Sequence, residues 1–182
     1  MDRKPFNRFI IISGSGKKVG KTFMATALIR AFSSQFPLIA LKISPHVHDS
    51  LGNIQLIAKI DGIRIFRDLE VHAKNSGQFL EAGAAKSFFM ETDDAHLSQA
   101  FDIFMERCNP TNQPVICESG ALSSLIKPGI LIFITRDIDH LEEHKLATLS
   151  RADLVLPAVS FFPSAFVSKI RFSENSWHIL PD

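Results

Sequence analysis

The sequence predicts an α/β fold, with a mostly parallel, twisted sheet and helices on both of its faces. Three observations predict it. A β-branched and aromatic run at residues 9–12 leads straight into a glycine-rich segment, Lys21–Phe32 has apolar residues at helical spacing, and a second apolar run follows at residues 38–43. Strand, loop, helix and strand in this order form a βαβ unit, in which the strands are parallel and the crossover is right-handed.

The length and composition predict one globular domain spanning residues 1–182. Hydrophobic residues make up 46% of the chain and charged residues 21%, which is typical of folded proteins. The net charge of +1 provides no general attraction to nucleic acid or to an anionic membrane. The N-terminal residues are polar, and no apolar run reaches the roughly 20 residues needed to cross a bilayer. We therefore expect a cytoplasmic protein that binds neither nucleic acid nor membrane.

The segment after the βαβ unit predicts an antiparallel insertion. Two β-rich runs, 54–60 and 63–69, are joined by the two residues Asp61 and Gly62, which is a strong hairpin signal. An uncovered edge strand pairs readily with another strand. The hairpin is therefore a candidate for extending the sheet between two copies of the chain, as in a homodimer.

The rest of the chain continues the alternation of strands and helices. Apolar runs predict strands at residues 86–90, 115–117, 130–134 and 154–156. Helices are predicted at residues 76–82, from a cap at Asp93 or Asp94 to about Arg107, and at residues 141–149. For the last segment, 161–182, we predict a helix and an edge strand.

The glycine-rich segment predicts a phosphate-binding loop, or P-loop. It lies between a strand and a helix, which is the context that such a loop requires. Its glycines let backbone N–H groups point into a concave nest, and the helix that follows adds its positive N-terminal end. We expect the phosphates of a nucleoside triphosphate to contact Gly14, Ser15, Gly16, Lys17, Lys18, Val19, Gly20, Lys21, Thr22 and Phe23.

Two residues of this loop have more specific expected roles. Lys21 can bridge the β- and γ-phosphates, and the Thr22 hydroxyl can ligate Mg²⁺. The spacing differs from the usual motif, because Ser15 stands where the first glycine is expected and Gly14 lies one position earlier. Lys17 and Lys18 are additional charges, and for Lys18 we expect exposure at the outer edge of the loop.

Three charged residues are expected beside the loop. Glu118 follows a buried strand, and Lys42 ends the second strand, so both belong to the carboxyl edge of a parallel sheet, where ligands bind. Glu118 is predicted to support Mg²⁺, and Asp49 is predicted to join it. His46 and His48 share the loop after Lys42 and permit metal or phosphate contact, although ordinary loop histidines are the simpler interpretation.

The segments around the loop resemble a family of GTP-binding proteins of molybdopterin-guanine dinucleotide biosynthesis, the MobB family. The resemblance is carried by Lys42 with the histidines and Asp49, by Lys74-Asn75-Ser76 followed by Ala82-Gly83-Ala84, and by Glu118. It covers roughly residues 9–120. It implies an accessory protein that binds GTP, hydrolyses it slowly, and works with a partner protein in molybdenum-cofactor maturation.

The loop itself is similar to that of dethiobiotin synthetase, which begins Gly-Thr and ends Val-Gly-Lys-Thr. Lys42, Asp49 and Glu118 match that family as well. This resemblance implies an ATP-dependent enzyme that activates a carboxylate or carbamate, with Lys21, Lys42 and Glu118 as catalytic residues. Both families share one fold, and both commonly dimerise.

Three departures limit the choice between these families. The Asn-His pair of the synthetases is not found, and Thr135-Arg136-Asp137 stands where a guanine-selective Asn-Lys-x-Asp motif belongs. The glycine-rich run after Glu118 is reduced to Ser119-Gly120. A GTP-binding accessory protein is favoured, with a synthetase-like enzyme and a relative that binds nucleotide without chemistry as alternatives.

Overall fold

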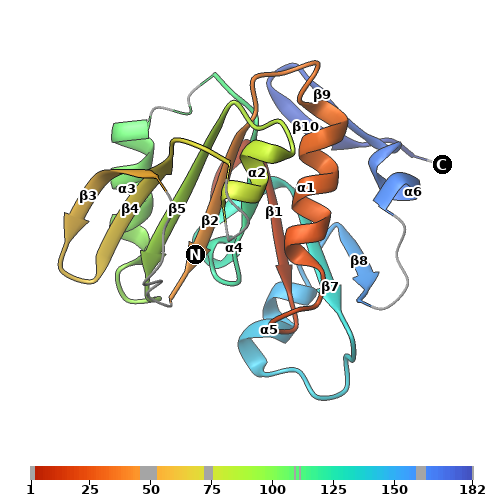
Figure 1. Ribbon diagram of the computed structural model, residues 1–182. Coiled ribbons are helices and arrows are strands. Elements are labelled where there is room, and N and C mark those ends of the chain that lie inside the picture. Colours follow the sequence, from red (N-terminus) through yellow and green to blue (C-terminus); the bar gives the residue numbers. More distant parts are fainter. Residues whose placement is uncertain are drawn as a thin grey trace.

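The computed structural model describes residues 3–45, 53–71, 76–108, 110, 112–158 and 163–181. Within them, one eight-stranded sheet has the order β3-β4-β5-β2-β6-β1-β7-β8 (Figure 1). Its strands are β1 (Lys4–Gly14), β2 (Ile39–Ser44), β3 (Ile54–Ile60), β4 (Ile63–Asp68), β5 (Lys86–Thr92), β6 (Val115–Glu118), β7 (Ile126–Thr135) and β8 (Leu154–Pro157). The helices are α1 (Lys21–Phe32), α2 (Gly77–Glu81), α3 (Leu97–Cys108), α4 (Leu122–Leu125), α5 (Glu143–Leu149) and α6 (Pro163–Val167).

The sheet is mostly parallel, as predicted. From β5 to β8 every neighbouring pair of strands is parallel. The β3–β4 hairpin is antiparallel and joins the sheet through an antiparallel pairing of β4 with β5. The predicted hairpin is therefore confirmed, with its two-residue turn at Asp61 and Gly62, where Gly62 has φ +73°. β3 forms the edge of the sheet.

Helices cover both faces of the sheet because its central strand is apolar on both sides. Ile10 and Ile12 of β1 pack in the core with α1 and α2, whereas Phe9 and Ile11 pack in a second core with α3 and α4 (Figure 1). All four side chains are fully buried. A continuous apolar run of this kind is what a strand covered on both faces requires.

The C-terminal segment differs from the prediction. A helix is present, α6, as predicted, but the described residues add no edge strand to the eight-stranded sheet. The chain instead forms a separate hairpin of β9 (Ile170–Ser173) and β10 (Ser176–Ile179). Its turn residues Glu174 and Asn175 have φ 50° and 62°, and such a two-residue turn folds the chain back on itself. Trp177 fixes this hairpin against α1, with its ring 5.1 Å from that of Phe32.

Other elements differ in their bounds. β1 begins at Lys4 rather than Phe9, β7 begins at Ile126 rather than 130, and α4 was not predicted. α3 begins at Leu97, three or four residues after the predicted caps, because the Asp93 carboxylate accepts the backbone N–H of His96 at 3.0 Å and holds the chain in a turn.

The topology places the predicted site at one edge of the sheet. After β1 the chain passes through α1 to β2 on one side of β1, and after β6 it passes to β7 on the other side. Open α/β sheets bind ligands at such a change of direction, beyond the carboxyl ends of the strands. α5 also lies at this end of the sheet, near the end of β1 (Figure 1). No helix in the described part of the chain is long and apolar enough to cross a membrane.

Candidate functional site

The loop from Gly14 to Gly20 leaves β1 in close contact with β7. Gly14 is buried, and a Cβ atom at this position would lie 2.5 Å from the backbone oxygen of Ile134 and 2.9 Å from a methyl group of Val19. Only glycine fits this approach of two backbones. The next residue secures it, because the backbone N–H of Ser15 donates to the Ile134 oxygen at 2.9 Å. The unusual position of the first glycine therefore follows from strand packing.

The loop ends at a helix terminus whose N-cap residue is a glycine and so has no side chain to cap it. Gly20 occupies the N-cap position of α1 with φ 106°, and the first turn contains no acidic residue. The first helical bond runs from Met24 N–H to Gly20 oxygen, so the amides of the turn before it have no acceptor within the helix. This end of α1 carries the partial positive charge that favours an anion.

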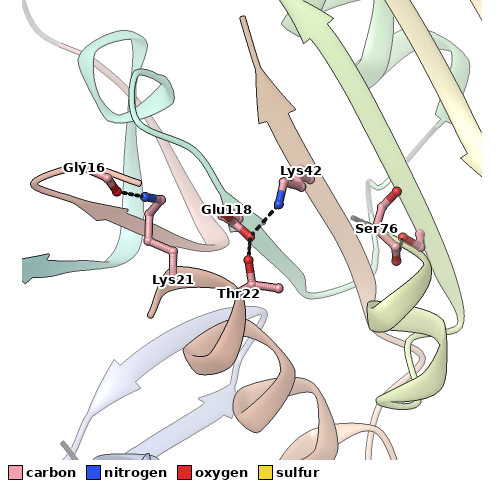
Figure 2. A network of polar contacts seen from close by, with 7 residues as sticks. Gly16, Lys21, Thr22, Lys42, Ser76 and Glu118 are labelled. Atoms are coloured by element: carbon pink, nitrogen blue, oxygen red, sulfur yellow. Dashed lines mark hydrogen bonds and ion pairs between the residues drawn. The ribbon is translucent and has the colours of Figure 1, made fainter. Parts of the chain in front are cut away.

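Lys21 points back into the loop that precedes it. Its ammonium donates to the backbone oxygen of Gly16 at 2.5 Å (Figure 2). Burial lowers the pKa of Lys21 below its ordinary value of 10.5, and the nearby cations Lys42 and Lys145 lower that pKa further, while Glu118 opposes them by raising it. A partly desolvated ammonium among other cations is a strong binding group for a polyanion.

Glu118 joins the loop to the second strand of the sheet. One of its oxygens accepts the Thr22 hydroxyl at 2.7 Å and lies 3.4 Å from the Lys42 ammonium (Figure 2). Lys42 and Glu118 are direct neighbours in the register of β2 and β6, which explains why they meet. The structure thus brings together four of the predicted residues: Lys21, Thr22, Lys42 and Glu118.

The Thr22–Glu118 pair suits a magnesium ion. Because the hydroxyl donates its proton to Glu118, the lone pairs of the Thr22 oxygen remain available for a cation. Mg²⁺ is usually held by one or two protein oxygens together with phosphates and water. Among the described residues no cluster of three or more His, Cys, Asp or Glu could hold a metal alone, so the phosphates would have to complete the coordination. The predicted ligand Asp49 lies outside the described residues, as do His46 and His48.

The remaining loop residues occupy less central positions. Lys17 and Lys18 are exposed, as predicted for Lys18, whose φ is 58°. Val19 is buried, and Phe23 in the first turn of α1 is 55% exposed. A cavity of about 250 Å³ is lined by Lys18, Glu118 and the four residues from Gly20 to Phe23. The candidate phosphate-binding groups of the loop meet at this cavity.

A second cavity of about 340 Å³ opens beside the loop. Gly14 belongs to its lining, together with Ser119 and Gly120 after Glu118. Lys145 and His144 of α5 line it as well, and Lys145 is close enough to influence the pKa of Lys21. The lining is mainly apolar, with Ile43, Pro45, Leu97 and Ala121.

The structure describes one residue of the Lys74-Asn75-Ser76 segment, Ser76. Lys74 and Asn75 lie outside the described residues. Ser76 is fully buried at the N-cap position of α2, and its backbone oxygen accepts the Ser87 hydroxyl at 2.8 Å. This bond ties α2 to β5.

Sequence reasoning missed two basic residues at the site. Lys145 belongs to a predicted helix, but nothing local in the sequence indicates that α5 lies at the carboxyl edge of the sheet. Arg136 directly follows β7, and its guanidinium donates to the backbone oxygen of Lys18 at 2.9 Å. The rule that parallel strands end at one edge could have identified Arg136, because it applies to β7 as well as to β2 and β6.

Comparison of the chain with protein-family models, with curated proteins and with solved structures found no match.

Proposed function

We propose that this chain is a P-loop protein that binds the phosphates of a nucleoside triphosphate, together with Mg²⁺, in the loop between β1 and α1. One observation carries the proposal. The Thr22 hydroxyl and the carboxylate of Glu118, 96 residues apart in the chain, meet at 2.7 Å beside a glycine-rich loop and an uncapped helix terminus. Binding groups for phosphate and an oxygen pair for a divalent cation thus lie side by side.

The charges at the site support a highly charged anion as the ligand. Among the described residues, Lys42 and Lys145 are the cations whose charges act on Lys21, and Glu118 is the acidic residue that acts on it. The excess of positive charge is unfavourable until an anion enters. Mg²⁺ held by Thr22 and Glu118 would neutralise charge on the β- and γ-phosphates.

Isothermal titration with Mg·GTP and Mg·ATP tests the proposal. We expect binding to wild-type protein and its loss in Lys21→Ala, because the ammonium that meets the phosphates is removed. Lys127→Ala is the matched control, because Lys127 is an exposed lysine of β7 paired with Pro5 of β1, far from the loop. Unchanged affinity in Lys21→Ala would refute the proposed site.

The choice of nucleotide and of cellular role rests on resemblance. Lys42 with the segment after it, and the 74–85 segment, favour GTP binding with slow hydrolysis, in an accessory role with a partner protein of molybdopterin-guanine dinucleotide biosynthesis. Equal affinity for Mg·GTP and Mg·ATP in the titration would count against this role.

The second cavity favours another candidate, an ATP-dependent carboxylation or ligation enzyme of the dethiobiotin synthetase type. Such an enzyme needs room for a second substrate beside the γ-phosphate, and the 340 Å³ cavity shares Gly14 with the phosphate loop. Lys21, Lys42 and Glu118 would then stabilise the charge of the transferring phosphoryl group. ATP turnover that rises when a diamine and bicarbonate are added would support this candidate, and no stimulation would exclude it.

A further inference from the structure

We propose that Arg136 is a positioning residue that holds the phosphate loop in its binding shape. This inference rests on the proposed function. The guanidinium reaches from the end of β7 to the backbone oxygen of Lys18 at 2.9 Å, at the outer bend of the loop. Arg136 therefore acts on the phosphates through the loop backbone, without being a catalytic residue.

The end of β7 contacts the loop at both its start and its bend. The Ile134 oxygen accepts the Ser15 N–H at 2.9 Å, and the Ser15 hydroxyl accepts the Arg136 N–H at 3.4 Å. These bonds hold the start of the loop, while the Arg136 side chain reaches its bend. The segment after β7 is itself braced, because the Thr135 hydroxyl donates to the Asp137 backbone oxygen at 2.6 Å.

The bend needs such support because of its backbone conformation. Lys18 has φ 58°, in the left-handed region that a residue with a long side chain rarely adopts. The hydrogen bond that the Arg136 guanidinium donates to the Lys18 backbone oxygen offsets the energetic cost of this φ. The carbonyl of Lys18 and the N–H of Val19 belong to one trans peptide and point in opposite directions. With the carbonyl directed to Arg136, the Val19 N–H points away from Arg136, and we expect a phosphate oxygen to accept it.

The test uses inorganic tripolyphosphate beside Mg·GTP and Mg·ATP, because tripolyphosphate has no base or sugar. We expect Arg136→Gln to weaken the binding of all three ligands by a similar factor, about tenfold, which is the scale of one hydrogen bond to a charged group. The melting temperature should change little, since Arg136 is exposed. Arg136→Lys keeps the charge and loses the planar guanidinium, so we expect it to restore binding only in part.

A pair of variants at Lys18 separates positioning from a simple charge effect. Lys18→Gly and Lys18→Ala both remove the side-chain charge, but only glycine adopts a positive φ readily. We expect Arg136→Gln to cost clearly less affinity in the Lys18→Gly background than in the Lys18→Ala background. Equal costs in the two backgrounds, or full restoration by Arg136→Lys, would overturn the proposal.

Two other outcomes would contradict the positioning role of Arg136. A loss confined to the nucleotides, with tripolyphosphate unaffected, would mean that Arg136 contacts the base or sugar and would overturn the positioning role. A large fall in the melting temperature of Arg136→Gln would assign the residue to the scaffold instead. Failure of the proposed function is distinguishable from all of these, because the wild-type protein would then not bind tripolyphosphate.

Discussion

The two glycines at the start of the loop between β1 and α1, Gly14 and Gly16, are predicted to respond differently to the same substitution. In Gly14→Ala the new methyl group would lie 2.5 Å from the backbone oxygen of Ile134, far inside van der Waals contact. A Cβ at Gly16 would have no atom within 4 Å. Both changes add one methyl group, so Gly16→Ala is a matched control for composition and unfolded-state entropy.

The magnitude follows from what must move. The neighbour at Gly14 is the backbone of β7, which cannot turn aside as a side chain could, and overpacking of this kind costs about 1–3 kcal/mol. Gly16→Ala is expected to change stability by less, and to raise it by as much as about 1 kcal/mol, because alanine restricts the unfolded chain. Moving the Ile134 oxygen also weakens its bond with the Ser15 N–H, so triphosphate binding should fall in Gly14→Ala.

Urea denaturation followed by circular dichroism measures the stability difference, and titration with Mg·GTP measures binding. In thermal denaturation, each kcal/mol of lost stability lowers the melting temperature of a chain of this size by about 2–4 °C, so Gly14→Ala should melt roughly 2–12 °C lower than wild type. Equal stability of the two variants, or a greater loss in Gly16→Ala, would refute the account of Gly14 as a packing requirement.

Three further predictions concern the charges and the sheet edge. Glu118→Gln should lower the free energy of unfolding by about 1–3 kcal/mol, since the half-buried ammonium of Lys42 loses its charged partner. In titrations, triphosphate without Mg²⁺ should bind to this variant at least as well as it does to wild type, and adding Mg²⁺ should bring no gain in affinity. Because the pKa of Lys21 is lowered, the affinity for triphosphate should fall as pH rises through that pKa. Over the same range the contribution of Lys21 to stability should rise, since the unfolded chain binds more protons than the folded one. Titrations and denaturation curves at alkaline pH measure both quantities, and a change of affinity and stability in the same direction would contradict the assignment. We expect a homodimer joined through the edge strand β3, whose Leu56 is 52% exposed. Light scattering should then report twice the chain mass for wild type and the mass of one chain for Leu56→Lys. A wild-type monomer at high concentration would exclude this interface.

Much of the site could be predicted because it is local. The loop, the helix after it and the strand before it are contiguous, and their glycines, lysines and apolar residues specify them without distant contacts. The same is true of the β3–β4 hairpin, whose Asp61-Gly62 turn determines its pairing. Lys42 and Glu118 required one further rule, that parallel strands end at a common edge of the sheet.

The sequence by itself determined the α/β class, the glycine-rich loop between a strand and a helix, and the edge of the sheet that Lys42 and Glu118 share with this loop, because these depend on residue type and short spacing. Only the tertiary structure decided that β6 lies between β1 and β2, which makes Lys42 and Glu118 register neighbours and brings Glu118 to Thr22. It also brought Lys145 and Arg136 to the loop and folded the C-terminal segment into its own hairpin. These contacts join segments far apart in the chain, and their geometry depends on strand order and packing rather than on any local preference.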